Sequence, residues 1–163
     1  MAALALTLSG FAAYVGYEGY FPVAKPPVAG DVATYGFGTT TGADGKPLKG
    51  GEKITPPAAV QLAVRDVEAH SERLKGCLEG VSLTQNEFDA YLSLALNVGT
   101  ANVCKSSIPA KLKRGDYAAA CKTILDFKKA QGRDCSLAAN KSFCGGIWIR
   151  RQGELKLCLG EQP

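Results

Sequence analysis

Two carboxylic acids and one hydroxyl lie close together near the start of this 163-residue chain. Glu18 is followed by Gly19, and Asp31 and Thr34 stand in a glycine-rich stretch that runs from residue 30 to residue 38. Hydrolysis of a glycosidic bond needs one acid that protonates the leaving oxygen and a second carboxylate that holds a water or stabilises the developing positive charge. The three residue types therefore predict a glycosidase site in which Glu18, Asp31 and Thr34 are catalytic.

Each of the three residues also has an ordinary structural explanation. A glutamate such as Glu18 suits a helix end, an aspartate such as Asp31 suits a turn after glycine, and a threonine such as Thr34 suits a strand. Any one of them alone would be explained that way. Their combination in this order favours catalysis.

The segments around these residues predict the elements that position them. Residues 19–54 are rich in glycine, proline and threonine and carry turn signals at Asp44-Gly45 and Gly50-Gly51, which predicts a small antiparallel sheet. Thr55 and Pro56 then suit the N-cap and first turn of a long helix over about 55–75. We expect this helix to connect two lobes.

The remainder of the chain, about 77–163, predicts an all-helical lobe. Thr84 and Glu87 have the spacing of a capping box at the start of a mostly buried helix that ends at Gly99. Further helices are expected near 108–114, 117–129 and 147–159, the second of them capped by Asp116. The segment from Gln131 to Gly146, which is polar and holds two cysteines, is expected to form a loop and a short helix tied by a disulfide.

Residues 1–17 contain no charged side chain and are weakly apolar. A cleaved signal peptide is disfavoured, because cleavage would remove the helix that leads into Glu18. Two interpretations stay open: a membrane anchor shorter and less apolar than a stable span, and a first helix buried along one side. The residues expected on that buried side are Leu4, Leu8, Phe11 and Tyr14 or Val15. Both interpretations can hold at different times.

The chain contains six cysteines and a single histidine, without a Cys-x-x-Cys pair. This pattern argues against a zinc site and favours three disulfides formed in an oxidising compartment. The sequence does not fix the pairing. The pairs expected here are Cys135 with Cys144, Cys104 with Cys121, and Cys77 with Cys158.

The formal net charge of +4 is unevenly distributed. Residues 1–100 carry 7 Lys/Arg and 10 Asp/Glu, whereas residues 101–163 carry 12 Lys/Arg and 5 Asp/Glu. The basic half would attract an anionic polymer or acidic lipid, or it is an ordinary solvated surface. No nucleic-acid partner is expected, because the lysines lack aromatic stacking partners and a reader motif.

Five elements in order resemble the phage-type lysozymes of glycoside hydrolase family 24, the endolysins of tailed phages and prophages. They are Glu18-Gly19 with Thr34-Tyr35-Gly36-Phe37-Gly38, then Leu83 to Ala90, Leu96-Asn97-Val98-Gly99, Lys111 to Tyr117, and Arg150-Arg151-Gln152-Gly153-Glu154. The resemblance implies a lysozyme-like α+β fold. In that fold a small antiparallel-sheet lobe and a larger helical lobe are joined by a long helix, so residues 18–163 form the catalytic domain.

The resemblance also implies a role for each site residue. Glu18 would be the general acid, kept protonated by an apolar setting, and Asp31 with Thr34 would position a water for inversion at the anomeric carbon. The family's aspartate lies six residues before the threonine, where this chain has Val28. Asp31 is therefore expected to take that role through a shifted loop.

Two further residues match cleft positions of the family. Asn97 and Arg150 are expected to bind substrate, with a helix-end role for Asn97 and a surface role for Arg150 as the alternatives. No cofactor and no metal ion is implied, and a monomer is expected.

The implied function is hydrolysis of the β-1,4 bond between N-acetylmuramic acid and N-acetylglucosamine in peptidoglycan, which lyses the host cell. The alternatives are a lytic transglycosylase on the same substrate and a noncatalytic cationic protein that binds the wall or a membrane. Residues 1–17 resemble the signal-arrest-release segment of some family members. The expected location is the host periplasm, after an initial tether to the inner membrane.

Overall fold

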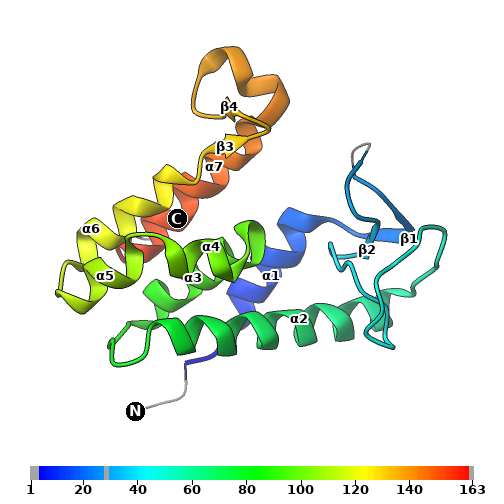
Figure 1. Ribbon diagram of the computed structural model, residues 1–163, viewed down its shortest axis with the longest axis horizontal. Helices are drawn as coiled ribbons and strands as arrows, with labels where there is room; N and C mark the ends of the chain where they lie inside the picture. Colours follow the sequence, from blue (N-terminus) through cyan, green and yellow to red (C-terminus); the bar gives the residue numbers. More distant parts are fainter. Residues whose placement is uncertain (1–3, 28–29, 162–163) are drawn as a thin grey trace. The chain divides into compact units, whose positions relative to one another are not determined.

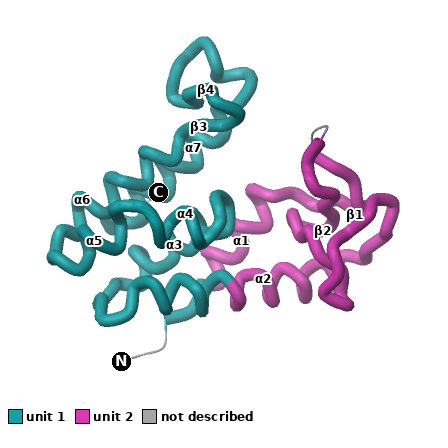
Figure 2. The backbone as a smooth tube through the Cα atoms, in the orientation of Figure 1, with its two compact units in different colours: residues 1–7, 70–163 teal, residues 8–69 magenta. Residues whose placement is uncertain are grey.

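The computed structural model describes residues 4–27 and 30–161 (Figure 1). Val28, which stands where the family's aspartate was expected, and the first three residues of the uncharged segment lie outside the described residues. The chain forms two compact units (Figure 2). One comprises Leu8–Ala69, and the other combines the N-terminal residues up to Thr7 with the chain from His70 onward.

The unit Leu8–Ala69 contains the predicted small antiparallel sheet. It comprises α1 (Leu8–Glu18), β1 (Phe21–Lys25), β2 (Thr34–Gly36) and the first part of α2 (Pro56–Cys77). The two strands pair antiparallel, with Phe21 opposite Gly36 and Lys25 opposite Thr34. A small core of Ala24, Tyr35 and Leu62, flanked by Leu48 and Ile54, packs the sheet against α2. The α+β class and the start of the long helix at Pro56 are confirmed.

Polar contacts fix the segment after β2 on α2. The Thr39 hydroxyl donates to a carboxylate oxygen of Asp66 over 2.9 Å, and the Arg65 guanidinium donates to the Thr41 hydroxyl over 3.2 Å. Gly36 allows the close approach: a Cβ atom at this position would lie 3.0 Å from the Ala59 Cβ. The turn that follows β2 therefore rests directly on α2.

The other unit is mainly helical. Its helix α3 (Gln85–Val98) carries a continuous run of buried residues and packs against α4 (Thr100–Lys105) and α7 (Lys141–Cys158), which makes it the central helix of the unit. The Thr84 and Glu87 capping box is formed as predicted, and α3 ends at Gly99, whose φ is 86°. The helices are α3 (Gln85–Val98), α4 (Thr100–Lys105), α5 (Ile108–Lys113), α6 (Tyr117–Lys122) and α7 (Lys141–Cys158), with 3-10 helices η1 (Thr123–Asp126) and η2 (Ala138–Asn140).

The predicted helix over 117–129 is too long. The regular helix ends at Lys122, where the Thr123 hydroxyl bonds back to the carbonyl of Ala119 over 3.0 Å and the chain tightens into η1. A short hairpin follows, formed by β3 (Lys129–Ala130) and β4 (Arg133–Asp134). The Asp116 side chain makes no capping hydrogen bond.

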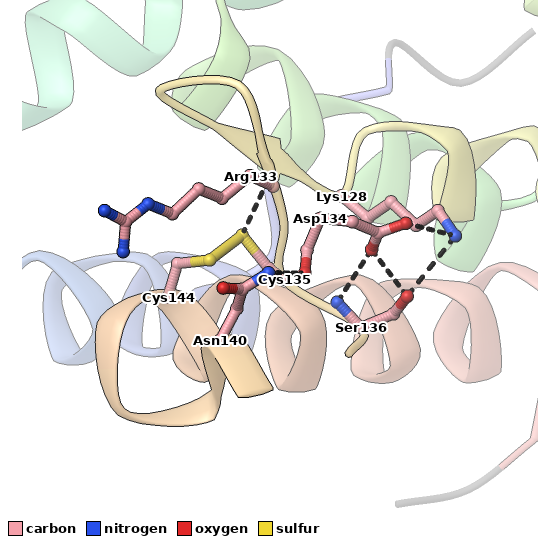
Figure 3. A network of polar contacts seen from close by, with 7 residues as sticks. All are labelled: Lys128, Arg133, Asp134, Cys135, Ser136, Asn140 and Cys144. Atoms are coloured by element: carbon pink, nitrogen blue, oxygen red, sulfur yellow. Dashed lines mark hydrogen bonds and ion pairs between the residues drawn. A yellow bond between two sulfur atoms is a disulfide. The ribbon is translucent and has the colours of Figure 1, made fainter. Parts of the chain in front are cut away.

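The hairpin is held by a polar network around Asp134 (Figure 3). The Asp134 carboxylate accepts hydrogen bonds from the backbone N–H and the hydroxyl of Ser136, and it forms an ion pair of 3.0 Å with Lys128. The Asn140 amide donates to the Asp134 carbonyl. Helix α7 begins at Lys141, six residues before the expected start at Ile147, and is kinked at Cys144.

Three disulfides are present, and all six cysteines lie in the helical unit. The local pair Cys135 with Cys144 is confirmed. The other two expected pairs are wrong, because the observed bonds are Cys77–Cys104 and Cys121–Cys158, with Cα atoms 5.8 and 5.7 Å apart. The physical reason is helix packing: the end of α2 lies beside α4, and the end of α7 lies beside the end of α6.

The uncharged N-terminal segment is helical only from Leu8 onward. Of the side expected to be buried, Tyr14 is 6% exposed, whereas Leu8 is 90% exposed. The residues before α1 are extended on α3: the Thr7 hydroxyl donates to Asp89 over 2.5 Å, and the Gln85 amide donates to the carbonyl of Ala5. Within residues 4–27 and 30–161, no helix has the length and apolar character needed to cross a membrane.

Candidate active site

Glu18 is the last residue of α1, and its position is set by Gly19. Gly19 has a φ of 69° and donates its N–H to the carbonyl of Val15 over 3.1 Å, which ends the helix in the left-handed conformation that glycine adopts readily. The Glu18-Gly19 pair of the sequence therefore has a structural meaning. The glycine stops α1 directly after the acid, so that the half-buried Glu18 side chain stands at the helix end.

The Glu18 carboxyl group lies against the glycine-rich turn that follows β2. A Cβ atom at Gly38 would be 3.1 Å from Glu18 Oε2 and 3.7 Å from its carboxyl carbon. Gly38 also has a φ of 82°, so both its conformation and the space beside it favour glycine. Two elements that the sequence motif joined, Glu18-Gly19 and the run from Thr34 to Gly38, thus meet in space.

Thr34 and Asp31 lie on the chain segment that leads into this turn. Thr34 is half-buried and is the first residue of β2. Asp31 is exposed in a bend that follows Gly30, whose φ is 91°. All three predicted catalytic residues belong to the unit Leu8–Ala69. The unit thus holds the two carboxyl groups that hydrolysis of a glycosidic bond needs, one half-buried and one exposed.

The sequence alone did not identify the residues that hold the turn against α1. Tyr14, which the periodicity predicted only as an apolar side chain, donates its hydroxyl to the carbonyl of Phe37 over 3.1 Å. The Tyr20 ring lies 5.8 Å from the Phe37 ring, and the Tyr20 hydroxyl donates to the carbonyl of Ile54. The only available signal was spacing, because Tyr14 precedes Glu18 by one helical turn.

The two expected substrate-binding residues lie in the helical unit. Asn97 is exposed near the end of α3, and its side-chain oxygen accepts a hydrogen bond of 2.9 Å from Arg151. Arg150 is only 5% exposed, and it donates to the Glu154 carboxylate and to the carbonyl of Ser93. The Arg150 guanidinium thus takes part in packing α7 against α3, and its contact with substrate stays a prediction.

A buried charged cluster therefore occupies the α3–α7 interface. Arg151 is fully buried and forms an ion pair of 2.9 Å with Glu154, which also accepts a hydrogen bond of 2.7 Å from the Ser93 hydroxyl. Burial raises the pKa of Glu154, whereas Arg151, Ser93 and Arg150 act in the opposite direction and favour the carboxylate. The motif from Arg150 to Glu154 thus supports the fold of the helical unit.

Residues 15–154 match the family described as phage lysozyme. The endolysin of Salmonella phage P22 is 31% identical over 103 residues, which are 63% of this chain and 69% of that protein. The SAR-endolysin of Haemophilus phage HP1 is 26% identical over 146 residues, which are 80% of this chain and 69% of that protein. The solved structure of the endolysin from Escherichia coli O157:H7 phage FAHEc1 superposes with a TM-score of 0.79 at 27% identity, covering 98% of this chain and 97% of that one. As the sequence motifs predicted, the chain belongs to the phage lysozyme family.

Proposed function

We propose that this protein is an endolysin that hydrolyses peptidoglycan at the β-1,4 bond between N-acetylmuramic acid and N-acetylglucosamine. The observation that carries the proposal is the position of the Glu18 carboxyl group against Gly38, at the end of a helix and over the turn that closes the family motif. Membership of the phage lysozyme family supports the substrate and the lytic role.

In the proposed reaction, Glu18 donates its proton to the glycosidic oxygen as the bond to the anomeric carbon breaks. Asp31, ionised and exposed, accepts a proton from a water that attacks the opposite face of the sugar, and the Thr34 hydroxyl orients that water. The product has the inverted anomeric configuration. Glu18 regains a proton from solvent and Asp31 releases one, so the site returns to its starting state.

The test is a set of conservative substitutions assayed by clearing of permeabilised bacterial cells. Glu18→Gln is expected to lower the rate by about 10²–10⁴-fold, which is the usual contribution of a general acid. Asp31→Asn and Thr34→Ala are expected to lower it as well. Glu68→Gln, at an exposed position on α2, is the matched control and should retain wild-type activity.

Two rival functions make different predictions in the same assay. A noncatalytic wall-binding or membrane-binding cation would lyse cells equally well after Glu18→Gln. A transglycosylase would release an anhydro sugar, which mass spectrometry of the products separates from the hydrolysis product by the mass of one water. Loss of activity in Glu18→Gln with retention in Asp31→Asn would keep the family reaction and overturn the assignment of the second carboxylate.

We further propose that residues 1–17 first tether the enzyme to the inner membrane and that release places it in the host periplasm. The uncharged sequence of this segment and the similarity to the SAR-endolysin of Haemophilus phage HP1 support the tether. The three disulfides suit an oxidising compartment outside the cytoplasm. Ala5 and Thr7 are hydrogen-bonded to α3 in the structure, an arrangement that we assign to the released form.

The tether is tested by making the segment more apolar. Two or three leucines inserted between Ala2 and Ser9 should hold the protein in the membrane fraction with little lytic activity, because a longer apolar run leaves the bilayer less readily. The same number of serines inserted at that position is the control. Full activity of membrane-bound protein carrying the leucines would exclude a tether that controls the enzyme.

A further inference from the structure

Two residues of α1 that are one helical turn apart lie against the turn after β2. Tyr14 is the single buried residue of the fully described helix α1, and it lies one turn before Glu18 on the same face. Its hydroxyl donates to the carbonyl of Phe37 over 3.1 Å. The next residue of the turn is Gly38, which lies against the Glu18 carboxyl group.

The turn and the end of β2 are also held by contacts with α2. Gly36 approaches Ala59 so closely that a Cβ atom would lie 3.0 Å from the Ala59 Cβ, and Thr39 is bonded to Asp66 of the same helix. The segment from residue 36 to residue 39 therefore has little freedom to move relative to α2. A hydrogen bond from α1 to this segment fixes the helix relative to a rigid partner.

We propose that Tyr14 is a positioning residue for Glu18, an inference that rests on the proposed function of Glu18 as the general acid. The bond from Tyr14 to the Phe37 carbonyl sets the rotation of α1 about its axis and the separation of the helix from the turn. Those two variables decide where the Glu18 carboxyl group lies relative to Gly38. Displacement of reacting groups by about 1 Å can cost about 10²-fold in rate, so the position of an acid is worth a dedicated contact.

A purely structural role for Tyr14 would be that of a ring filling the core, and one substitution separates the two roles. Tyr14→Phe keeps the ring and removes the hydroxyl. We expect kcat to fall by about 3–10-fold, the range that corresponds to loss of one neutral hydrogen bond. KM should change little, since the contact touches no substrate. The limb of the pH–rate profile that reports the protonated acid should shift, because the surroundings of Glu18 change.

Tyr117→Phe is the matched control, as Tyr117 lies on α6 in the helical unit. All assays are run well below the melting temperature of each variant, so that unfolding does not contribute. If Tyr14→Phe keeps the wild-type kcat and pH profile while Glu18→Gln is inactive, Tyr14 is only a core residue and the proposed function stands. If Glu18→Gln is active, the proposed function itself fails. A lowered kcat with an unchanged pH profile and an equal effect of Tyr117→Phe would also overturn the positioning role.

Discussion

Two separate features favour glycine at position 38, its backbone conformation and its closeness to Glu18, and neither can be read from the sequence motif alone. Its φ of 82° lies in the left-handed region, and its Cα faces the carboxyl group of Glu18. Gly45 provides a useful contrast, because its φ of 77° is similar, but apart from its two chain neighbours no described residue has a heavy atom within 4 Å of the position of an added Cβ. Substitutions at the two glycines therefore separate the effect of backbone conformation from the effect of crowding against Glu18.

Gly38→Ala and Gly45→Ala are expected to cost similar amounts of stability, about 1–2 kcal/mol each, because alanine disfavours a left-handed backbone. Only Gly38→Ala should lower kcat, since its methyl group would displace Glu18. Denaturant titration and cell-clearing rates check the two parts separately. Equal activity of both variants would show that the approach of Gly38 to Glu18 has no part in catalysis.

Single residues also differ in how far their surroundings can be predicted from the sequence. The positions of Glu18 at a helix end and of Thr34 at the start of a strand were predictable because their neighbouring glycines shape the backbone locally. The burial of Arg150 was not, since a charged residue in a motif is compatible with a cleft, a surface or a buried ion pair. Only the packing of α7 against α3 decides among them, and that packing depends on residues distant in the sequence.

At the scale of elements, the interface of α3 and α7 contains a buried carboxylate, that of Glu154. Glu154 is ion-paired with Arg150 and Arg151, and it accepts the Ser93 hydroxyl. Glu154→Gln should lower the free energy of unfolding by about 3–5 kcal/mol, because two buried guanidinium groups would lose their counter-charge. Glu161→Gln, at an exposed position beyond α7, is the control for urea titrations of both variants. A loss below the scatter of the control would mean that water or other groups replace Glu154.

The β3–β4 hairpin has a carboxylate whose titration can be followed directly. Hydrogen bonds from Ser136, together with the nearby Lys128, lower the pKa of Asp134 to about 2 (Figure 3). Because the folded pKa is depressed, the stabilisation is present above the ordinary value of 3.8 and is lost as the pH falls through about 2. Ser136→Ala should raise the pKa of Asp134 toward its ordinary value in an NMR titration. An unchanged pKa in that variant would assign the shift to the backbone N–H of residue 136 and to Lys128 instead.

The elements themselves were predicted unevenly, for identifiable reasons. The starts of α2 and α3 carry local capping signals, at Pro56 and at Thr84 with Glu87, and both were placed correctly. The end of α6 has no such signal, because the chain leaves the helix through the Thr123 hydroxyl and a hairpin. Four cysteines could be paired only after the helices were placed, since their separations in sequence permit several arrangements.

At the scale of the whole molecule, the residues before α1 belong to the helical unit, where they are hydrogen-bonded to α3, whereas α1 belongs to the unit Leu8–Ala69. Asp89 is buried, and its carboxylate accepts hydrogen bonds from Thr7 and Gln85. Under the proposed tether, Asp89→Ala removes this docking site for the released segment. The ratio of membrane-bound to released protein should rise by about tenfold, since a hydrogen bond to a charged group contributes about 1.5 kcal/mol or more. Asp126→Ala is the exposed control, and fractionation of both variants followed by immunoblotting measures the difference.

Ala5 and Thr7 are hydrogen-bonded to α3, so the residues before α1 occupy a binding site on the enzyme itself, as an intramolecular ligand. If the bilayer and α3 compete for this ligand, the active fraction at any moment is a ratio of two affinities. Holding that fraction near 1% requires a preference for the bilayer of only about 2.7 kcal/mol. A weakening of membrane binding by that amount would bring about half of the molecules into the active form.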